Sequence, residues 1–138
     1  RNGADIIRVR KMFRDNLADY RAKAEAVDKA EIYKDSFAIG VCDPTGTESP
    51  TVVGAQAANS LLEIRSIKAA IVLTPFDGKI YVSARSIDEV NVQIMMEKLG
   101  GGGHKSVAGA QLTDVSVEEA KDRLKAIIDE MMNEGDIL

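Results

Sequence analysis

The dipeptide Asp77-Gly78 constrains the fold of this 138-residue chain more than any other feature. It stands between two stretches, 68–74 and 79–85, whose length and apolar content are those of β-strands. An Asp-Gly pair in this position is a strong signal for a two-residue hairpin, because both residues of its type I′ turn need positive φ. A hairpin joins antiparallel strands, so we expect a sheet that is not purely parallel.

The other elements follow from hydrophobic periodicity and helix caps. Apolar runs predict two further strands, at residues 36–42 and 108–112. Helical spacing predicts helices at 5–16, 17–33, 49–64 and 89–99, and a last one opened by the capping box Ser116–Glu119. We therefore expect an α/β domain with a mixed β-sheet of about four to five strands and flanking helices, at residues 36–138, after an N-terminal helical linker at residues 1–35.

Four consecutive glycines, Gly100 to Gly103, are followed directly by the only histidine, His104, and by Lys105. Glycine is costly to order, but it lets the backbone turn at positive φ and approach a ligand closely. Such a loop can leave several N–H groups free to bind an anion. The alternative is a helix C-cap with a hinge, which explains one or two glycines. Because the run follows a predicted helix and precedes a predicted strand, it is neither a Walker A loop nor a Rossmann turn.

The strand predicted at 79–85 has two different faces. Apolar residues alternate along it with a second set, Tyr81, Ser83 and Arg85, which we expect to line a surface or a cleft. Arg85 and the glycine run lie at opposite ends of one predicted helix, and the sequence alone does not show whether they meet. If they do, an arginine fork, backbone donors, an imidazole and an ammonium form a set suited to phosphate.

Residues suited to catalysis are missing from this set. The chain has one histidine and one cysteine, and no Asp/His cluster at metal-ligand spacing. Acids such as Glu118 and Glu119 are explained by their favourable place at a helix start. The residues therefore indicate a binding domain without a catalytic partner. The net charge of −4 argues against binding to duplex DNA, and Cys42, in an apolar run, predicts a buried, reduced thiol.

Three motifs resemble those of a known family. The stretches Ser83-Ala-Arg-Ser86, Asn91-Val-Gln93 and Gly101-Gly-Gly-His104, the last followed by Ala108-Gly109, are similar to the DHH-associated domain of the DHH phosphoesterase superfamily. The match covers about residues 36–132 and is most like the GdpP-type cyclic-di-AMP phosphodiesterases. Residues 1–35 then correspond to the helical linker that leads out of a preceding DHH domain.

The resemblance implies a function and a set of site residues. Such proteins hydrolyse cyclic di-AMP to pApA with two manganese ions held by the DHH domain, and are anchored in the membrane with these domains in the cytoplasm. The present chain would then bind substrate, be inactive alone and hold no metal. The partners would be a cyclic dinucleotide or short oligoribonucleotide and the DHH domain of the same chain, and a homodimer is compatible with this. Carried over by position, the substrate contacts are Arg85, Gly101, Gly102, Gly103 and His104, with Ser83, Asn91 and Lys105 as weaker candidates.

Two alternatives remain open at this point. Related enzymes that degrade nanoRNA or pApA carry a similar loop, and this chain does not distinguish their substrates from cyclic di-AMP. In the other alternative the chain is a noncatalytic interaction or dimerisation module, in which the glycine run is only a hinge and His104 braces the loop.

Overall fold

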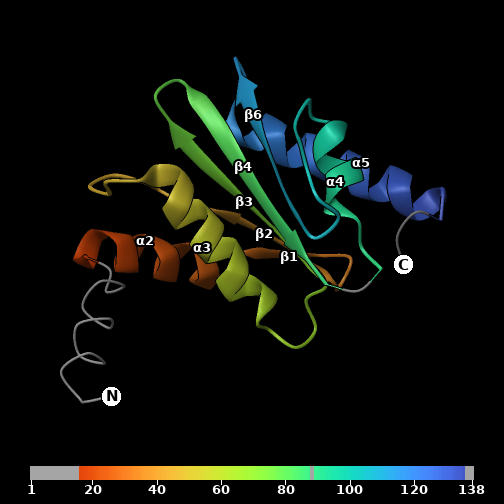
Figure 1. The fold of residues 1–138 in the computed structure, drawn as a ribbon, viewed down its shortest axis with the longest axis horizontal. Helices are drawn as coiled ribbons and strands as arrows, with labels where there is room; N and C mark the ends of the chain where they lie inside the picture. The colour runs from red at the N-terminus through yellow and green to blue at the C-terminus, as the bar shows by residue number, and fades with distance from the viewer. Residues whose placement is uncertain (1–15, 88, 136–138) are drawn as a thin grey trace, which may run out of the picture.

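The computed structural model describes residues 16–87 and 89–135, which form a mixed sheet between two layers of helices (Figure 1). The elements, in chain order, are α2 (Leu17–Asp28), β1 (Glu31–Tyr33), β2 (Phe37–Val41), α3 (Pro50–Leu62), β3 (Ala69–Phe76), β4 (Lys79–Ser86), α4 (Val92–Glu97), β5 (Gly102–Gly103), β6 (Val107–Thr113) and α5 (Val117–Asn133). The predicted α/β class with a mixed sheet and a preceding helix is confirmed. The described residues contribute six strands, one more than the upper prediction.

The strands lie in the order β1-β2-β3-β4-β6-β5. Among the strands of the described residues, only β2 and β3 pair in parallel, and α3 forms the crossover between them. The predicted hairpin joins β3 to β4, and its turn residues Asp77 and Gly78 have φ of 54° and 75°, as a type I′ turn requires. β6 pairs antiparallel with the other edge of β4, and β5 pairs antiparallel with β6.

Each face of the sheet carries its own core. On one face, α2 and α3 pack through small and aliphatic residues such as Ala26, Ala57 and Leu61 against Val72 and its neighbours. On the other face, α4 and α5 cover a larger core, which contains Met95, Met96, Leu124 and Ile128. Figure 1 shows α2 and α3 on one side of the strands and α4 and α5 on the other. The alternation of buried residues along β4 follows from this, because successive side chains point to opposite faces.

The N-terminal part departs from the prediction. The helix predicted at 17–33 ends at Asp28, and residues 31–33 form the edge strand β1. A tight turn at Lys34 and Asp35, with φ of 52° and 66°, returns the chain into β2. Apart from Asn16, which caps α2, the helix predicted at 5–16 lies outside the described residues.

The helix α2, which lies in the segment predicted as a linker, packs on this domain. Ala22 and Ala26 are buried against the sheet. The fit is close, because a Cβ on Gly40 of β2 would lie 3.2 Å from the carbonyl oxygen of Ala26. The helix therefore belongs to the layer that α3 forms.

Caps and burial agree with the sequence in part. The hydroxyl of Ser116 accepts a hydrogen bond from the Glu119 N–H at 3.1 Å, as the capping box predicts. Ser49 occupies the cap position of α3 but its side chain makes no capping hydrogen bond.

Cys42 is fully buried and unpaired, as predicted. In the part of the chain that the structure describes, no helix has the length and apolarity needed to cross a membrane.

Candidate functional site

The polar set predicted from the alternation of β4 lies together on the α3 face of the sheet. Tyr81, Ser83 and Arg85 are half-buried there, and the register places Gln111, Gly109 and Val107 of β6 opposite them. The helix α3 packs on β2, β3 and β4, whereas Val107 on β6 is 46% exposed. The outer part of this face, formed by β4, β6 and β5, is therefore accessible from solvent.

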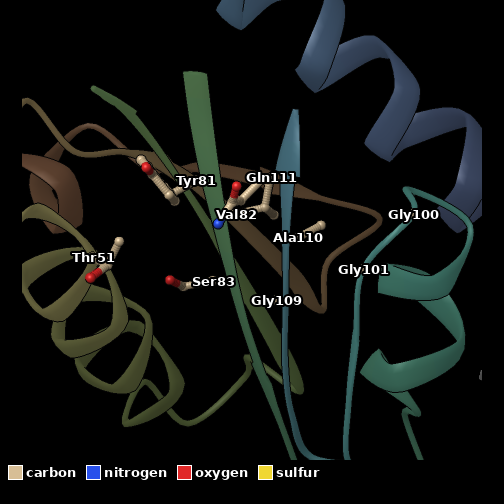
Figure 2. A pocket seen from close by; sticks show the side chains of 9 residues that line it. All are labelled: Thr51, Tyr81, Val82, Ser83, Gly100, Gly101, Gly109, Ala110 and Gln111. Carbon is tan, nitrogen blue, oxygen red and sulfur yellow. The ribbon is translucent and has the colours of Figure 1, made fainter. Parts of the chain in front are cut away.

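A pocket of about 490 Å³ opens on this face. Its walls come from four elements, as Figure 2 shows: Thr51 in the first turn of α3, Tyr81 and Ser83 on β4, Gln111 on β6, and Gly100 and Gly101 after α4. Two predicted residues, Ser83 and Gly101, thus line one pocket although 18 positions separate them in the sequence.

The glycines serve different structural needs. Gly100 has φ of 85° and its N–H donates to the Glu97 carbonyl at 3.0 Å, so it ends α4 as the C-cap alternative predicts. A Cβ on Gly101 would collide with the carbonyl oxygen of Gly109, because the loop lies directly against β6. Gly103 combines a φ of 143° with a close approach to β6, since a Cβ there would lie 2.6 Å from the Val107 carbonyl oxygen. Gly102 has neither a positive φ nor a close contact with β6, and a Cβ there would meet nothing within 4 Å.

The predicted cradle of free N–H groups is only partly present. The N–H groups of Gly100, Gly101 and His104 all donate to carbonyls of the protein, the last to Val107 at 2.7 Å. Two elements accept these bonds. The Gly100 and Gly101 N–H groups donate to the Glu97 and Met96 carbonyls at the end of α4, whereas the His104 N–H donates to β6, with which β5 pairs. The glycine loop therefore offers a ligand close backbone approach more than a ring of unpaired donors.

Arg85 and His104, which the sequence left unconnected, both lie beside Val107. Arg85 is its partner across β4 and β6, and the His104 N–H bonds it from the other side. Their backbones are thus about two strand spacings apart, roughly 10 Å. The Arg85 side chain is half-buried, donates to the Ala84 carbonyl at 2.9 Å, and has its pKa lowered by desolvation. His104 and Lys105 are exposed. Three groups of the predicted phosphate-binding set, Arg85, His104 and Lys105, thus come from one corner of the sheet, where β4 ends and β6 begins.

A buried serine holds this corner together. The hydroxyl of Ser86 donates to the Val90 carbonyl at 2.7 Å and approaches the Lys105 carbonyl at 3.3 Å. The Ser86 N–H donates to the Ser106 carbonyl, and the Val92 N–H to that of Lys105. The second serine of the Ser83–Ser86 motif therefore fixes the loop that carries His104 to the end of β4.

The remaining predicted residue, Asn91, has a structural task. Its side chain accepts a hydrogen bond from the Ile94 N–H at 3.2 Å and so caps α4, which is shorter than predicted. Thr51 and Gln111 were not predicted. Their approach to Tyr81 depends on the position of α3 and the register of β6, which no local pattern encodes.

The described residues do not fit a metal centre. Across residues 16–87 and 89–135, no group of three or more His, Cys, Asp and Glu side chains could hold a metal ion. We therefore assign no metal-dependent step to them.

Comparison with known proteins gives the family. Residues 36–134 match the DHHA1 domain. The chain is 40% identical over 131 residues to the cyclic-di-AMP phosphodiesterase PdeA of Listeria monocytogenes, covering 92% of this chain and 19% of that protein. It is also 40% identical over 135 residues to the cyclic-di-AMP phosphodiesterase GdpP of Bacillus subtilis, covering 96% and 20%. The chain thus spans about a fifth of the length of these relatives.

A solved structure shares the fold. An exopolyphosphatase-related protein of Bacteroides fragilis superposes with a TM-score of 0.80 at 18% identity, over 95% of this chain and 39% of the other. The glycine loop, the strand motif and the mixed sheet thus agree with the sequence match, and the chain belongs to the DHHA1 domain family.

Proposed function

We propose that this chain is the substrate-binding domain of a cyclic-di-AMP phosphodiesterase, which hydrolyses cyclic di-AMP to pApA. The observation that carries this proposal is the convergence of Arg85, His104 and the glycine loop around Val107, at one end of an accessible face with a pocket. The identity of 40% to two cyclic-di-AMP phosphodiesterases supports the substrate class.

The chemistry expected of these residues is charge stabilisation. Arg85 carries a planar guanidinium that can donate two hydrogen bonds to phosphate oxygens. The exposed His104 imidazole can donate one more to a non-bridging oxygen, and Lys105 adds positive charge. Such groups help catalysis when they bind the charge that develops on phosphoryl oxygens in the transition state.

The glycine loop supplies access rather than charge. Gly102 presents no side chain toward open space, so a ligand can approach the backbone there. Gly101 and Gly103 keep the loop against β6, which sets the distance between the loop and Arg85. Ser83 lies between Tyr81 and Arg85 on the same face and is within reach of a ligand that spans them.

The catalytic metal belongs to another domain in this proposal. The described residues do not fit a metal centre, and the family resemblance places two manganese ions in a DHH domain that precedes this one in the same chain. We therefore expect the present chain to be inactive alone and to complete the site when it closes over the substrate. By the same resemblance, the parent protein is anchored in the membrane and this domain acts in the cytoplasm.

Calorimetric titration tests the proposal directly. The wild-type chain, free of metal, is titrated with cyclic di-AMP and with pApA, and the variants Arg85→Ala and His104→Ala are compared with it. The control is Arg65→Ala, because Arg65 is exposed beyond the far end of α3. Circular dichroism verifies that each variant is folded.

Loss of one charged hydrogen bond costs about 1.5–3 kcal/mol, which corresponds to a rise in Kd of roughly tenfold to hundredfold. We expect that rise for Arg85→Ala and His104→Ala and no change for Arg65→Ala. Unchanged affinity in both site variants would contradict the proposal and favour an interaction module. The ratio of the two wild-type affinities separates cyclic di-AMP from linear pApA as the preferred ligand.

A further inference from the structure

The pocket and the cationic corner of the same face differ in chemistry. None of the nine described residues that line the pocket carries a charge. Arg85, His104 and Lys105 are all outside its walls. A phosphate needs the cations, so the neutral pocket is suited to another part of a ligand.

The polar side chains of the pocket are free to bind a ligand. Tyr81 and Gln111 are directly opposite partners in the register of β4 and β6, and such residues have Cβ atoms about 5 Å apart. Among the described residues, no hydrogen bond engages the Tyr81 hydroxyl, the Gln111 amide or the Thr51 hydroxyl. These three groups come from β4, β6 and α3 and surround one pocket (Figure 2).

The distance between the two ends suits one nucleotide. Side chains on the same face of a strand are about 6.6 Å apart, so Tyr81 and Arg85 are separated by roughly 13 Å along β4. The long Arg85 side chain covers part of that distance. Between them, Ser83 lies opposite Gly109, which has no side chain. Gly109 lines the same pocket with backbone alone, so no side chain from β6 stands opposite Ser83.

We infer that the pocket of Thr51, Tyr81 and Gln111 binds the adenine base of the nucleotide whose phosphate lies at the Arg85–His104 corner. This inference rests on the proposed function. The Tyr81 ring offers a surface on which a base can stack, a contact that accounts for much of nucleotide affinity in other proteins. The Gln111 carboxamide offers one donor and one acceptor, which match the N7 and N6 groups of adenine.

The test separates the base from the phosphate. The ligands are pApA, adenosine, which lacks phosphate, and ribose 5-phosphate, which lacks a base. The variants are Gln111→Leu and Tyr81→Leu, with Tyr81→Phe as the conservative change that keeps the ring. Matched controls are Gln93→Leu on α4, at the opposite face of the sheet, and Tyr20→Leu on the exposed side of α2.

We expect Gln111→Leu and Tyr81→Leu each to raise the Kd for pApA by about tenfold, the order of magnitude of one lost base contact. Tyr81→Phe keeps the ring and loses only the hydroxyl, so it should raise this Kd less than Tyr81→Leu does. The controls Gln93→Leu and Tyr20→Leu should bind as the wild type does. Ribose 5-phosphate should bind all five variants equally. Adenosine should shift the NMR signals of Tyr81 and Gln111 but not those of residues 102–105.

The outcomes distinguish the two claims. If Arg85→Ala and His104→Ala weaken pApA binding but Gln111→Leu and Tyr81→Leu do not, the base subsite is wrong and the proposed function stands. If the pocket variants alone weaken binding, the base subsite stands and the assigned phosphate corner is wrong. Equal losses in the controls would also overturn the base subsite. If the wild type binds no nucleotide, both claims fail.

Discussion

Replacing Gly101 and Gly102 one at a time by alanine separates loop packing from ligand access. Neither residue has φ in the left-handed region, so alanine meets no backbone strain of that kind at either position. The two positions differ in what a Cβ would contact. At Gly101 it would collide with the Gly109 carbonyl oxygen and lie 2.7 Å from the Ala110 Cα, whereas at Gly102 it would meet nothing within 4 Å.

The magnitude follows from this difference. Alanine restricts the unfolded chain equally at both positions, so that contribution of about 0.4–1 kcal/mol cancels when the two variants are compared. What remains is the overpacking at Gly101, where the atoms in the way belong to the β6 backbone. Overpacking of this kind costs about 1–3 kcal/mol. For a domain of this size, that corresponds to a difference in Tm of roughly 4 °C for each kcal/mol.

The assay is thermal unfolding followed by circular dichroism, combined with calorimetric titration with pApA. We expect Gly101→Ala to melt well below Gly102→Ala. We expect Gly102→Ala to melt about 2–4 °C above the wild type, from the smaller entropy of its unfolded chain. It should nevertheless bind pApA more weakly, because its methyl group lies where the ligand approaches. Equal melting temperatures for the two variants would refute the packing argument, and unchanged pApA binding by Gly102→Ala would refute the access argument.

Three further predictions concern groups around the sheet. Ser86→Ala removes the donor to the Val90 carbonyl and should lower the free energy of unfolding in urea by about 1–2 kcal/mol; an unchanged value would contradict its role as a brace. The Tyr33 hydroxyl donates to Asp129 at 2.7 Å, and this bond raises the pKa of Tyr33 above its ordinary value. The stability it adds is therefore present below the unfolded pKa and lost as the pH rises through the folded one, and Asp129→Asn should lower the phenolate midpoint in an ultraviolet titration. Burial raises the pKa of Cys42 to about 11, so its alkylation at pH 8 should be slow in the native chain and fast in urea; equal rates would contradict its burial.

The hairpin and α5 were predicted correctly because residues adjacent in the sequence specify them. The Asp77-Gly78 turn needs only its own two residues to favour a hairpin, and the apolar stripe of α5 is complete within its own sequence. By contrast, β1 and β5 are three and two residues long and exist because neighbouring strands pair with them. The turn at Lys34 carries no glycine to mark its positive φ. Such short strands have no period of their own to detect.

For the candidate site, too, the sequence predicted what a local pattern specifies and missed what depends on tertiary packing. The alternation along residues 79–85 predicts that Tyr81, Ser83 and Arg85 share one face, and the structure confirms this. The roles of Thr51 and Gln111 depend on how α3 and β6 are positioned, which is tertiary information. The sequence left open where the glycine run lies relative to β4, and its N–H donors were expected to be free. The last carbonyls of α4 accept from Gly100 and Gly101, and β6 accepts from His104, because backbone N–H groups of an ordered loop are satisfied by the nearest free carbonyls.

The measurement that tests the central claim most directly is an NMR titration of the labelled, metal-free chain with cyclic di-AMP and with pApA, and with His104→Ala as the control. The account predicts shifts at Arg85 and at residues 100–109, extending to Tyr81 and Gln111, and the loss of the shifts around the loop in the variant. Shifts that cluster on α2 or α5, or that persist unchanged in His104→Ala, would contradict it.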